Sequence, residues 1–157
     1  MGTAAIPSST ILNNQAALDR ARTEQEKLVL ALAATESSRI LFHYTDNVSA
    51  RMIFGCQCII ATPTYYGHIN GGDGYIRPSG AYATPLPPWN PAMTQRDLAS
   101  FIFRKPQGKD VSFAAVIRNV GDWQSTQATY LEWVKRAPPG APVPAQVITT
   151  VPNLMKP

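Results

Sequence analysis

Two residues in short, strand-like segments carry side chains that could bind a polar ligand. His43 follows the apolar run of residues 40–42, and Tyr82 stands in residues 80–84, which read GAYAT. An imidazole can donate to a hydroxyl or accept from one, and a tyrosine offers a flat apolar face with a polar tip. Neither role requires a metal. His43 and Tyr82 are therefore the first candidate binding residues of the chain.

Familiar cofactor and hydrolase motifs are missing from the chain. The sequence has no G-x-G-x-x-G between a strand and a helix, no G-x-x-x-x-G-K-[ST], no H-E-x-x-H and no G-x-S-x-G. These absences remove support for a dinucleotide-binding Rossmann fold, a P-loop, a zinc protease and a hydrolase with a nucleophile elbow.

Cys56 and Cys58 are the only cysteines, and one residue separates them. Cysteines this close along a chain are poorly placed for an unstrained disulfide, so we expect no disulfide scaffold. A zinc site would need two more ligands, and the spacing of His43 and His68 from the cysteines matches no familiar zinc pattern. We therefore expect no metal, and two small buried cysteines on one face of a strand.

Length and composition indicate one compact domain. The chain has 157 residues, of which 45% are hydrophobic and 15% are charged, and its net charge is +4. No run of about 18 apolar residues could cross a bilayer, and the first ten residues lack the features of a signal peptide. We expect a soluble chain that does not enter a membrane, and its positive charge favours an acidic partner.

The two ends of the chain frame the expected domain, residues 14–136. Residues 1–13 should fray, whereas residues 14–35 are rich in good helix formers and predict a helix. Residues 137–145 are proline-rich and cannot lie in a helix interior or a central strand, so they predict a stiff connector. Residues 137–157 are accordingly expected to form a proline-rich C-terminal segment.

Strands and a capped helix follow one another in the middle of the chain. Residues 40–44 predict a strand, and Asp46 or Asn47 can cap a helix that Gly55 would end. Residues 58–61 predict a second strand.

A glycine-containing loop and another helix come next. Residues 62–79 predict a long loop, and residues 81–84 a short extended segment. Thr94 and Asp97 have the spacing of a capping box at the start of a helix. The apolar side of this helix is expected to consist of Leu98, Phe101 and Ile102, and further strands are expected at residues 111–117, 130–134 and 146–151.

This order of features resembles the His-Tyr-Asp family of ADP-ribosyltransferase-like toxin domains, which is related to the poly(ADP-ribose) polymerases. The resemblance rests on LFHYTD at residues 41–46 and on GAYAT at residues 80–84, with a capped helix, a strand and a loop between them. It continues more weakly to Val134. It implies an α+β fold with a split, mostly antiparallel pair of sheets, an N-terminal helix, a helix after the first core strand, and a cleft for NAD⁺.

The resemblance also implies roles for single residues. His43 looks like the histidine that hydrogen-bonds the adenosine ribose of NAD⁺, and the backbone next to it, at Tyr44, would hold the nicotinamide amide. Tyr82 looks like the catalytic-site aromatic residue that packs against the nicotinamide ring, with Gly80 leaving room for the cofactor. Thr62 is expected to assist the ribose on the nicotinamide side.

Two further features of the 62–79 loop bear on these roles. Tyr75 also follows a glycine, but Tyr82 is preferred because Thr84 and several prolines follow it, as in the family. The loop from Gly67 to Ser79 is expected to close over the cofactor.

A third, acidic residue is expected from the chemistry. Cleavage of the bond between ribose and nicotinamide builds positive charge on the ribose, so a carboxylate that accepts from the 2′-hydroxyl would stabilise the transition state. Glu132 is the first choice, and Asp110 and Asp122 are the alternatives.

The implied activity is an NAD-consuming ADP-ribosyltransferase, with NAD⁺ as a substrate and no metal. The resemblance further suggests a toxin domain that is delivered as part of a secreted effector, acts in the cytoplasm of a target cell on a protein or nucleic-acid acceptor, and is countered by an immunity protein. Three alternatives stay open: an NAD glycohydrolase, a nucleic-acid-binding module without catalysis, and a non-catalytic interaction domain that kept the fold.

Overall fold

The computed structural model describes residues 39–63, 65–66, 76–89, 92–103, 108–126 and 132–157, together with isolated positions between 16 and 27. Those isolated positions (16, 19, 20, 23, 24 and 27) are helical and exposed, and they fall within the helix expected at residues 14–35. The other residues of the 14–35 segment and residues 1–13 lie outside the described residues.

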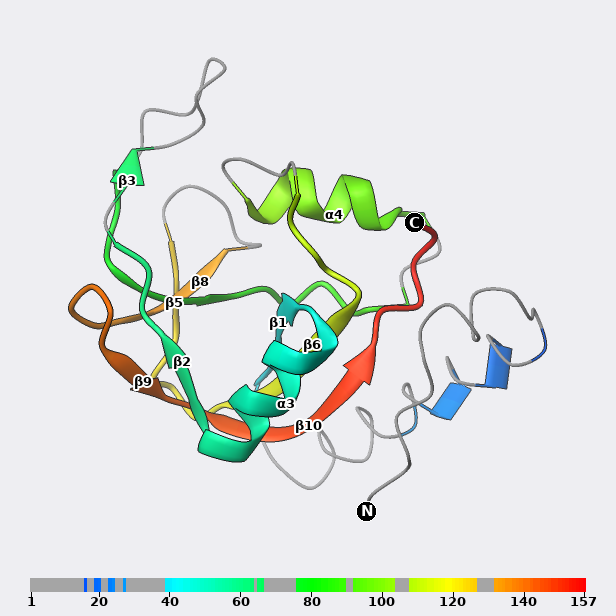
Figure 1. Ribbon diagram of the computed structural model, residues 1–157, viewed down its shortest axis with the longest axis horizontal. Helices are drawn as coiled ribbons and strands as arrows, with labels where there is room; N and C mark the ends of the chain where they lie inside the picture. Colours follow the sequence, from blue (N-terminus) through cyan, green and yellow to red (C-terminus); the bar gives the residue numbers. More distant parts are fainter. Residues whose placement is uncertain are drawn as a thin grey trace.

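The longest strands form a three-stranded sheet in the order β1-β6-β10. These strands are β1 (Arg39–Thr45), β6 (Phe113–Asn119) and β10 (Gln146–Pro152), and both pairings are antiparallel, with a register shift in β10 between Val147 and Thr149. Apolar strand formers at residues 40–42 and 113–117 account for the burial of the two neighbouring strands. In Figure 1 this sheet occupies the centre of the molecule.

Shorter antiparallel pairings surround this sheet. The strands are β5 (Gly80–Ala83), β8 (Trp133–Arg136) and β7 (Gln124–Ser125) in one sheet, β2 (Cys58–Ile60) with β9 (Pro142–Pro144) in another, and β3 (Tyr65–Tyr66) with β4 (Ile76–Arg77) in a third. Single antiparallel bridges join Phe42 to Thr84 and Thr62 to Gly80. The fold is therefore α+β, with mostly antiparallel sheets, as the sequence predicts.

Both helices described in full begin at the predicted caps. Helix α3 (Asn47–Cys56) starts after Asp46, which accepts from the backbone N–H of Ser49 at 2.7 Å. Its end differs from the prediction at Gly55, because Gln57 adopts the left-handed conformation that closes the helix. Helix α4 (Gln95–Ile102) has the predicted capping box in full.

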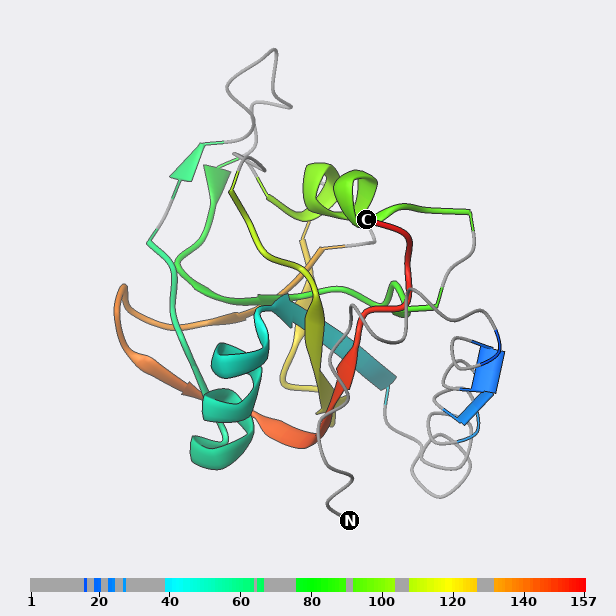
Figure 2. The same cartoon turned by 45° about the vertical axis from the view of Figure 1, so that its right-hand side comes forward.

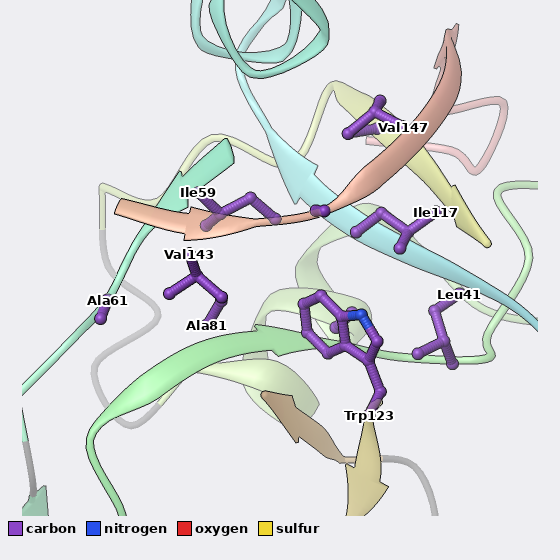
Figure 3. Close-up of a cluster of buried hydrophobic side chains, with 11 residues drawn as sticks. Leu41, Ile59, Ala61, Ala81, Ile117, Trp123, Val143 and Val147 are labelled. Atoms are coloured by element: carbon purple, nitrogen blue, oxygen red, sulfur yellow. The ribbon is translucent and has the colours of Figure 1, made fainter. Parts of the chain in front are cut away.

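Alternate residues of β6 serve two hydrophobic clusters on opposite faces of the central sheet. Ala115 and Ile117 pack in a cluster with Trp123, whose indole lies among side chains of β1, β2, β5, β9 and β10 (Figure 3). Ala114 and Val116 pack in a second cluster with Leu98 of α4. Since Ile53 of α3 packs against the first cluster, the two helices cover opposite faces of the sheet, as Figures 1 and 2 show.

The proline-rich segment is part of the fold. We expected residues 137–145 to be a connector, but β9 lies within them and pairs with β2, and Val143 is buried. Proline tolerates the edge of a sheet, where its missing N–H leaves no ladder bond unmade. Residues 146–152 form β10 of the central sheet, so the C-terminal segment shares the core of the preceding domain.

Other local expectations were wrong. Cys56 and Cys58 form a disulfide with their Cα atoms 5.3 Å apart, and Cys56 is exposed, because the chain turns sharply at Gln57 between helix and strand. Phe101, expected on the buried side of α4, is 56% exposed. The expected loop at residues 62–79 contains the β3–β4 pairing, and the residues between these strands lie outside the described part of the chain.

Gly80 is required by the close approach of β5 to β8. A Cβ at this position would lie 2.5 Å from the Lys135 carbonyl oxygen and 3.0 Å from the Arg136 Cα. Because these are backbone atoms, we expect Gly80→Ala to lower the free energy of unfolding by about 1–3 kcal/mol, the usual cost of overpacking. Urea denaturation measures this loss. The control is Gly55→Ala in α3, where nothing lies within 4 Å and where the change should be neutral or stabilising.

Candidate functional site

A cavity of about 410 Å³ is lined by residues of β1 and β5, which the bridge between Phe42 and Thr84 joins. Its size is typical of small-molecule sites. Its walls come from β1, β2, β5 and the end of α4, and it is lined by Phe42, His43, Tyr44, Ile59, Ile60, Thr62, Ala81, Tyr82, Ala83, Thr84, Phe101, Ile102, Phe103, Lys109 and Glu132. The cavity is mostly apolar, with a few polar groups that converge on it.

His43 is fixed by a hydrogen bond to the strand opposite. Its Nδ1 lies 2.7 Å from the backbone carbonyl oxygen of Tyr82. Because a carbonyl only accepts, Nδ1 carries the proton, and Nε2 of the neutral ring is then an acceptor. Burial lowers the pKa of His43 from 6.5, while the bond to Tyr82 acts in the opposite direction. His43 is therefore a neutral, oriented imidazole at neutral pH.

The lowered pKa of His43 predicts a pH dependence of stability. The unfolded chain takes up the proton at a higher pH than the folded chain, so the free energy of unfolding should fall as the pH drops below 6.5. Urea denaturation between about pH 7.5 and about pH 5 measures this slope. In His43→Gln the slope should become flatter, and equal slopes in the two proteins would contradict the assignment. Asp46 does not interfere, because its hydrogen bonds from Ser49 lower its pKa below 3.8.

Tyr82 and Tyr44 both reach the cavity, and both hydroxyls are engaged elsewhere. The hydroxyl of Tyr82 donates to the backbone carbonyl of Pro78, which holds the half-buried ring in place. The hydroxyl of Tyr44 donates to the carbonyl of Leu86 at 2.6 Å, and burial raises its pKa well above 10.0. Both hydroxyls therefore already donate within the protein, and the backbone of Tyr44 pairs with Ala114 in the central sheet.

Thr62 and Gly80 face each other across a backbone bridge. Thr62 lines the cavity, and its hydroxyl donates to the carbonyl of Gly80 at 3.1 Å. Gly80 itself does not line the cavity. We expected this glycine to leave room for the cofactor, but the space beside its Cα is taken by the backbone of β8.

Glu132 lines the cavity. We expected it within a strand, but it precedes β8 by one residue. One carboxylate oxygen accepts from Nε of Arg77 at 2.8 Å, and the other accepts from the hydroxyl of Thr126 at 2.6 Å. The side chains of Arg77 and Glu132 are only 5% and 13% exposed. Two partners thus orient the carboxylate and keep it from bulk solvent.

The alternative carboxylates lie elsewhere. Asp122 forms an ion pair with Lys135 at 3.0 Å, and Asp110 accepts from the backbone N–H of Ser112 at 2.8 Å. Neither lines the cavity. Of the three acidic candidates, the structure brings only Glu132 together with His43 and Tyr82.

Sequence reasoning missed three residues at this site. Arg77 stands in the segment predicted as a loop, and Thr126 and Lys109 stand in segments without a recognisable motif. A buried arginine needs a carboxylate partner. Arg77, three residues before the GAYAT segment, was the signal in the sequence that could have indicated an ion pair at this site. Tyr75, His68 and the glycine cluster of residues 71–74 lie outside the described residues.

Comparison of the chain with protein families, with curated proteins and with solved structures found no match. Within the described ranges, no three His, Cys, Asp or Glu side chains gather as metal ligands would. The same ranges contain no helix with the length and apolar character needed to cross a bilayer.

Proposed function

We propose that the chain is an ADP-ribosyltransferase, which binds NAD⁺ in the cavity between β1 and β5 and breaks the bond between ribose and nicotinamide. The observation that carries this proposal is that His43, Tyr82 and Glu132, which are distant in sequence, line one cavity. The resemblance of residues 40–84 to the transferase family implies the roles of His43 and Tyr82, and the chemistry of the reaction adds Glu132 as the carboxylate.

The cavity residues fit the groups of a dinucleotide. Nε2 of His43 can accept from a ribose hydroxyl, since Nδ1 is committed to the Tyr82 carbonyl. The ring of Tyr82 and the apolar walls at Ile59 and Ala81 suit a flat aromatic ring. These contacts bind NAD⁺ and orient it in the cavity.

Glu132 supplies the electrostatic part of the proposed reaction. When the bond from C1′ to nitrogen breaks, its electron pair leaves with nicotinamide and positive charge develops on the ribose. A carboxylate that accepts from the 2′-hydroxyl stabilises this charge more strongly in the transition state than in the bound substrate. The lone pair of an acceptor then forms the new bond to C1′, and the acceptor loses a proton to solvent.

Nicotinamide release from NAD⁺ tests the proposal. The purified chain is incubated with NAD⁺, with and without cell lysate, and free nicotinamide and labelled macromolecules are followed by chromatography. We expect release that increases with lysate and transfers label to an acceptor. Release without any labelled acceptor would identify an NAD glycohydrolase instead, and no release under either condition would refute NAD consumption.

His43→Ala should weaken the binding of NAD⁺ as well as turnover. It removes an acceptor that the substrate uses in both the ground state and the transition state, so the Michaelis constant should rise about tenfold, the effect of one lost hydrogen bond of about 1.4 kcal/mol. Thr149→Ala on β10 serves as the control, since Thr149 does not line the cavity. An unchanged Michaelis constant in His43→Ala would remove His43 from the binding site.

A further inference from the structure

A second groove runs along α4 next to the cavity. Its lining consists of Gln95, Arg96, Ala99 and Ser100 of the helix, residues 108–111, and the last residue of the chain, Pro157. Lys109 lines both this groove and the cavity. The two depressions therefore share one lining residue.

The groove contains two cations without a carboxylate partner. Arg96 is exposed and forms no ion pair with any residue that the structure describes, and the same holds for Lys109. Asp110 is the acidic side chain on this lining, and one of its oxygens already accepts from the backbone N–H of Ser112. The terminal carboxylate of Pro157 is on the same lining, so Arg96 and Lys109 are available to an anionic partner as two local cations and not as a net positive surface.

Aromatic side chains lie where the groove meets the cavity. The ammonium of Lys109 lies 5.3 Å from the ring centre of Phe103, which also lines the cavity. Phe101, on the cavity side of α4, is 56% exposed, so an apolar ring faces solvent at the mouth of the cavity. Cations that follow a backbone, next to exposed rings on which bases can stack, are the features of sites for single-stranded nucleic acids.

We propose that the α4 groove binds the phosphates of a single-stranded nucleic acid through Arg96 and Lys109, and that a base stacks on Phe101 at the mouth of the cavity. A base placed there is the acceptor of ADP-ribose, a part of the inference that rests on the proposed function. In that step a base nitrogen gives its lone pair to C1′ and loses one proton to solvent, while nicotinamide leaves with the electrons of the broken bond. Binding itself depends only on the groove.

Fluorescence anisotropy with a labelled single-stranded DNA, without NAD⁺, tests the binding. A length of about 12 nucleotides spans a typical site for one small domain. Arg96→Ala and Lys109→Ala should each weaken binding about five- to tenfold at low salt, and each should reduce the slope of log K against log salt by about 0.7. Phe101→Ala should weaken binding about tenfold with no change of that slope.

Arg51→Ala provides the matched control, because Arg51 is an exposed cation on α3, on the opposite face of the central sheet. An equal loss in Arg51→Ala would overturn the proposal, as would equally tight binding of a polyglutamate peptide. Competition by NAD⁺ that depends on Arg96 would assign the groove to the pyrophosphate of the substrate, and would also overturn it.

The acceptor step has a separate measurement. Transfer of label from radioactive NAD⁺ to the same oligonucleotide should be reduced by Arg96→Ala in proportion to the loss of binding. If the oligonucleotide binds through Arg96 and Lys109 but nicotinamide is never released, the proposed function is wrong and the groove assignment stands. If nicotinamide is released and no oligonucleotide binds, the groove assignment is wrong and the proposed function stands.

Discussion

Glu132→Gln is expected to lower the rate of nicotinamide release by about 10²-fold to 10³-fold, the range for loss of one electrostatic stabiliser of a transition state. The amide keeps nearly the same shape but removes the negative charge, which matters most when the ribose is most positive. The Michaelis constant should change little, in contrast to His43→Ala. Single-turnover measurement of nicotinamide release at saturating NAD⁺ checks this result.

The position of Glu132 adds a requirement to that experiment. Glutamine also removes the negative charge that faces Arg77, so the variant should be less stable than the parent. The release assay must be run well below the midpoint of thermal unfolding, which circular dichroism supplies for each variant. Asp110→Asn and Asp122→Asn are the controls, because neither carboxylate lines the cavity. If folded Glu132→Gln releases nicotinamide at the parent rate, Glu132 is not the stabilising carboxylate. If a control variant loses nicotinamide release instead, that carboxylate has the catalytic role.

Arg77→Ala should lower the free energy of unfolding by about 3–5 kcal/mol, the usual cost of removing one partner from a buried ion pair. The guanidinium and the carboxylate of Glu132 are 2.8 Å apart and largely shielded from water. Alanine would leave that carboxylate with the hydroxyl of Thr126 as its remaining side-chain partner among the described residues. Urea denaturation of the two proteins gives the difference directly.

A surface ion pair provides the comparison for Arg77. Lys135 and Asp122 are 3.0 Å apart, but their side chains are 25% and 35% exposed, so Lys135→Ala should cost no more than about 1 kcal/mol. If Arg77→Ala and Lys135→Ala lower the free energy of unfolding by similar amounts, burial of the pair between Arg77 and Glu132 does not raise its contribution to stability. The double variant Arg77→Met with Glu132→Leu should recover part of the stability, because it removes both charges together.

Local signals predicted the elements whose causes are local. The apolar run at residues 40–44 became β1, Asp46 caps α3, and the pair Thr94 and Asp97 forms a capping box at α4. Each depends on neighbours within a few residues, which is the range over which strand propensity and capping act.

Features that depend on distant partners could not be predicted in this way. β9 lies in a proline-rich segment that forms a strand only because β2 offers an edge to pair with. The closure of α3 at Gln57 brings Cys56 and Cys58 together, and no residue type in the sequence announces a left-handed glutamine. Glu132 precedes β8 because the start of that strand is set by its pairing with β5.

In the candidate site, too, some features could be predicted from the sequence and others could not. The order of the motifs around His43 and Tyr82 was sufficient to select two residues that share a hydrogen bond across 39 positions. The partners of Glu132 could not be predicted from the sequence, because Arg77 and Thr126 come from separate segments that meet only in the folded chain. Gly80 was expected to leave room for the cofactor, but the structure requires a glycine there because the backbone of β8 approaches its Cα.

Titration of the ¹⁵N-labelled chain with NAD⁺, followed by nuclear magnetic resonance, tests the central claim most directly. We expect saturable shifts of the Nε2 resonance of His43, of the backbone amides of residues 81–84, and of the amide of Thr62, because all of these groups lie at the cavity. The backbone amide of Arg51 on α3 should not move. Shifts confined to residues outside the cavity, or none at millimolar NAD⁺, would contradict binding of NAD⁺ between β1 and β5.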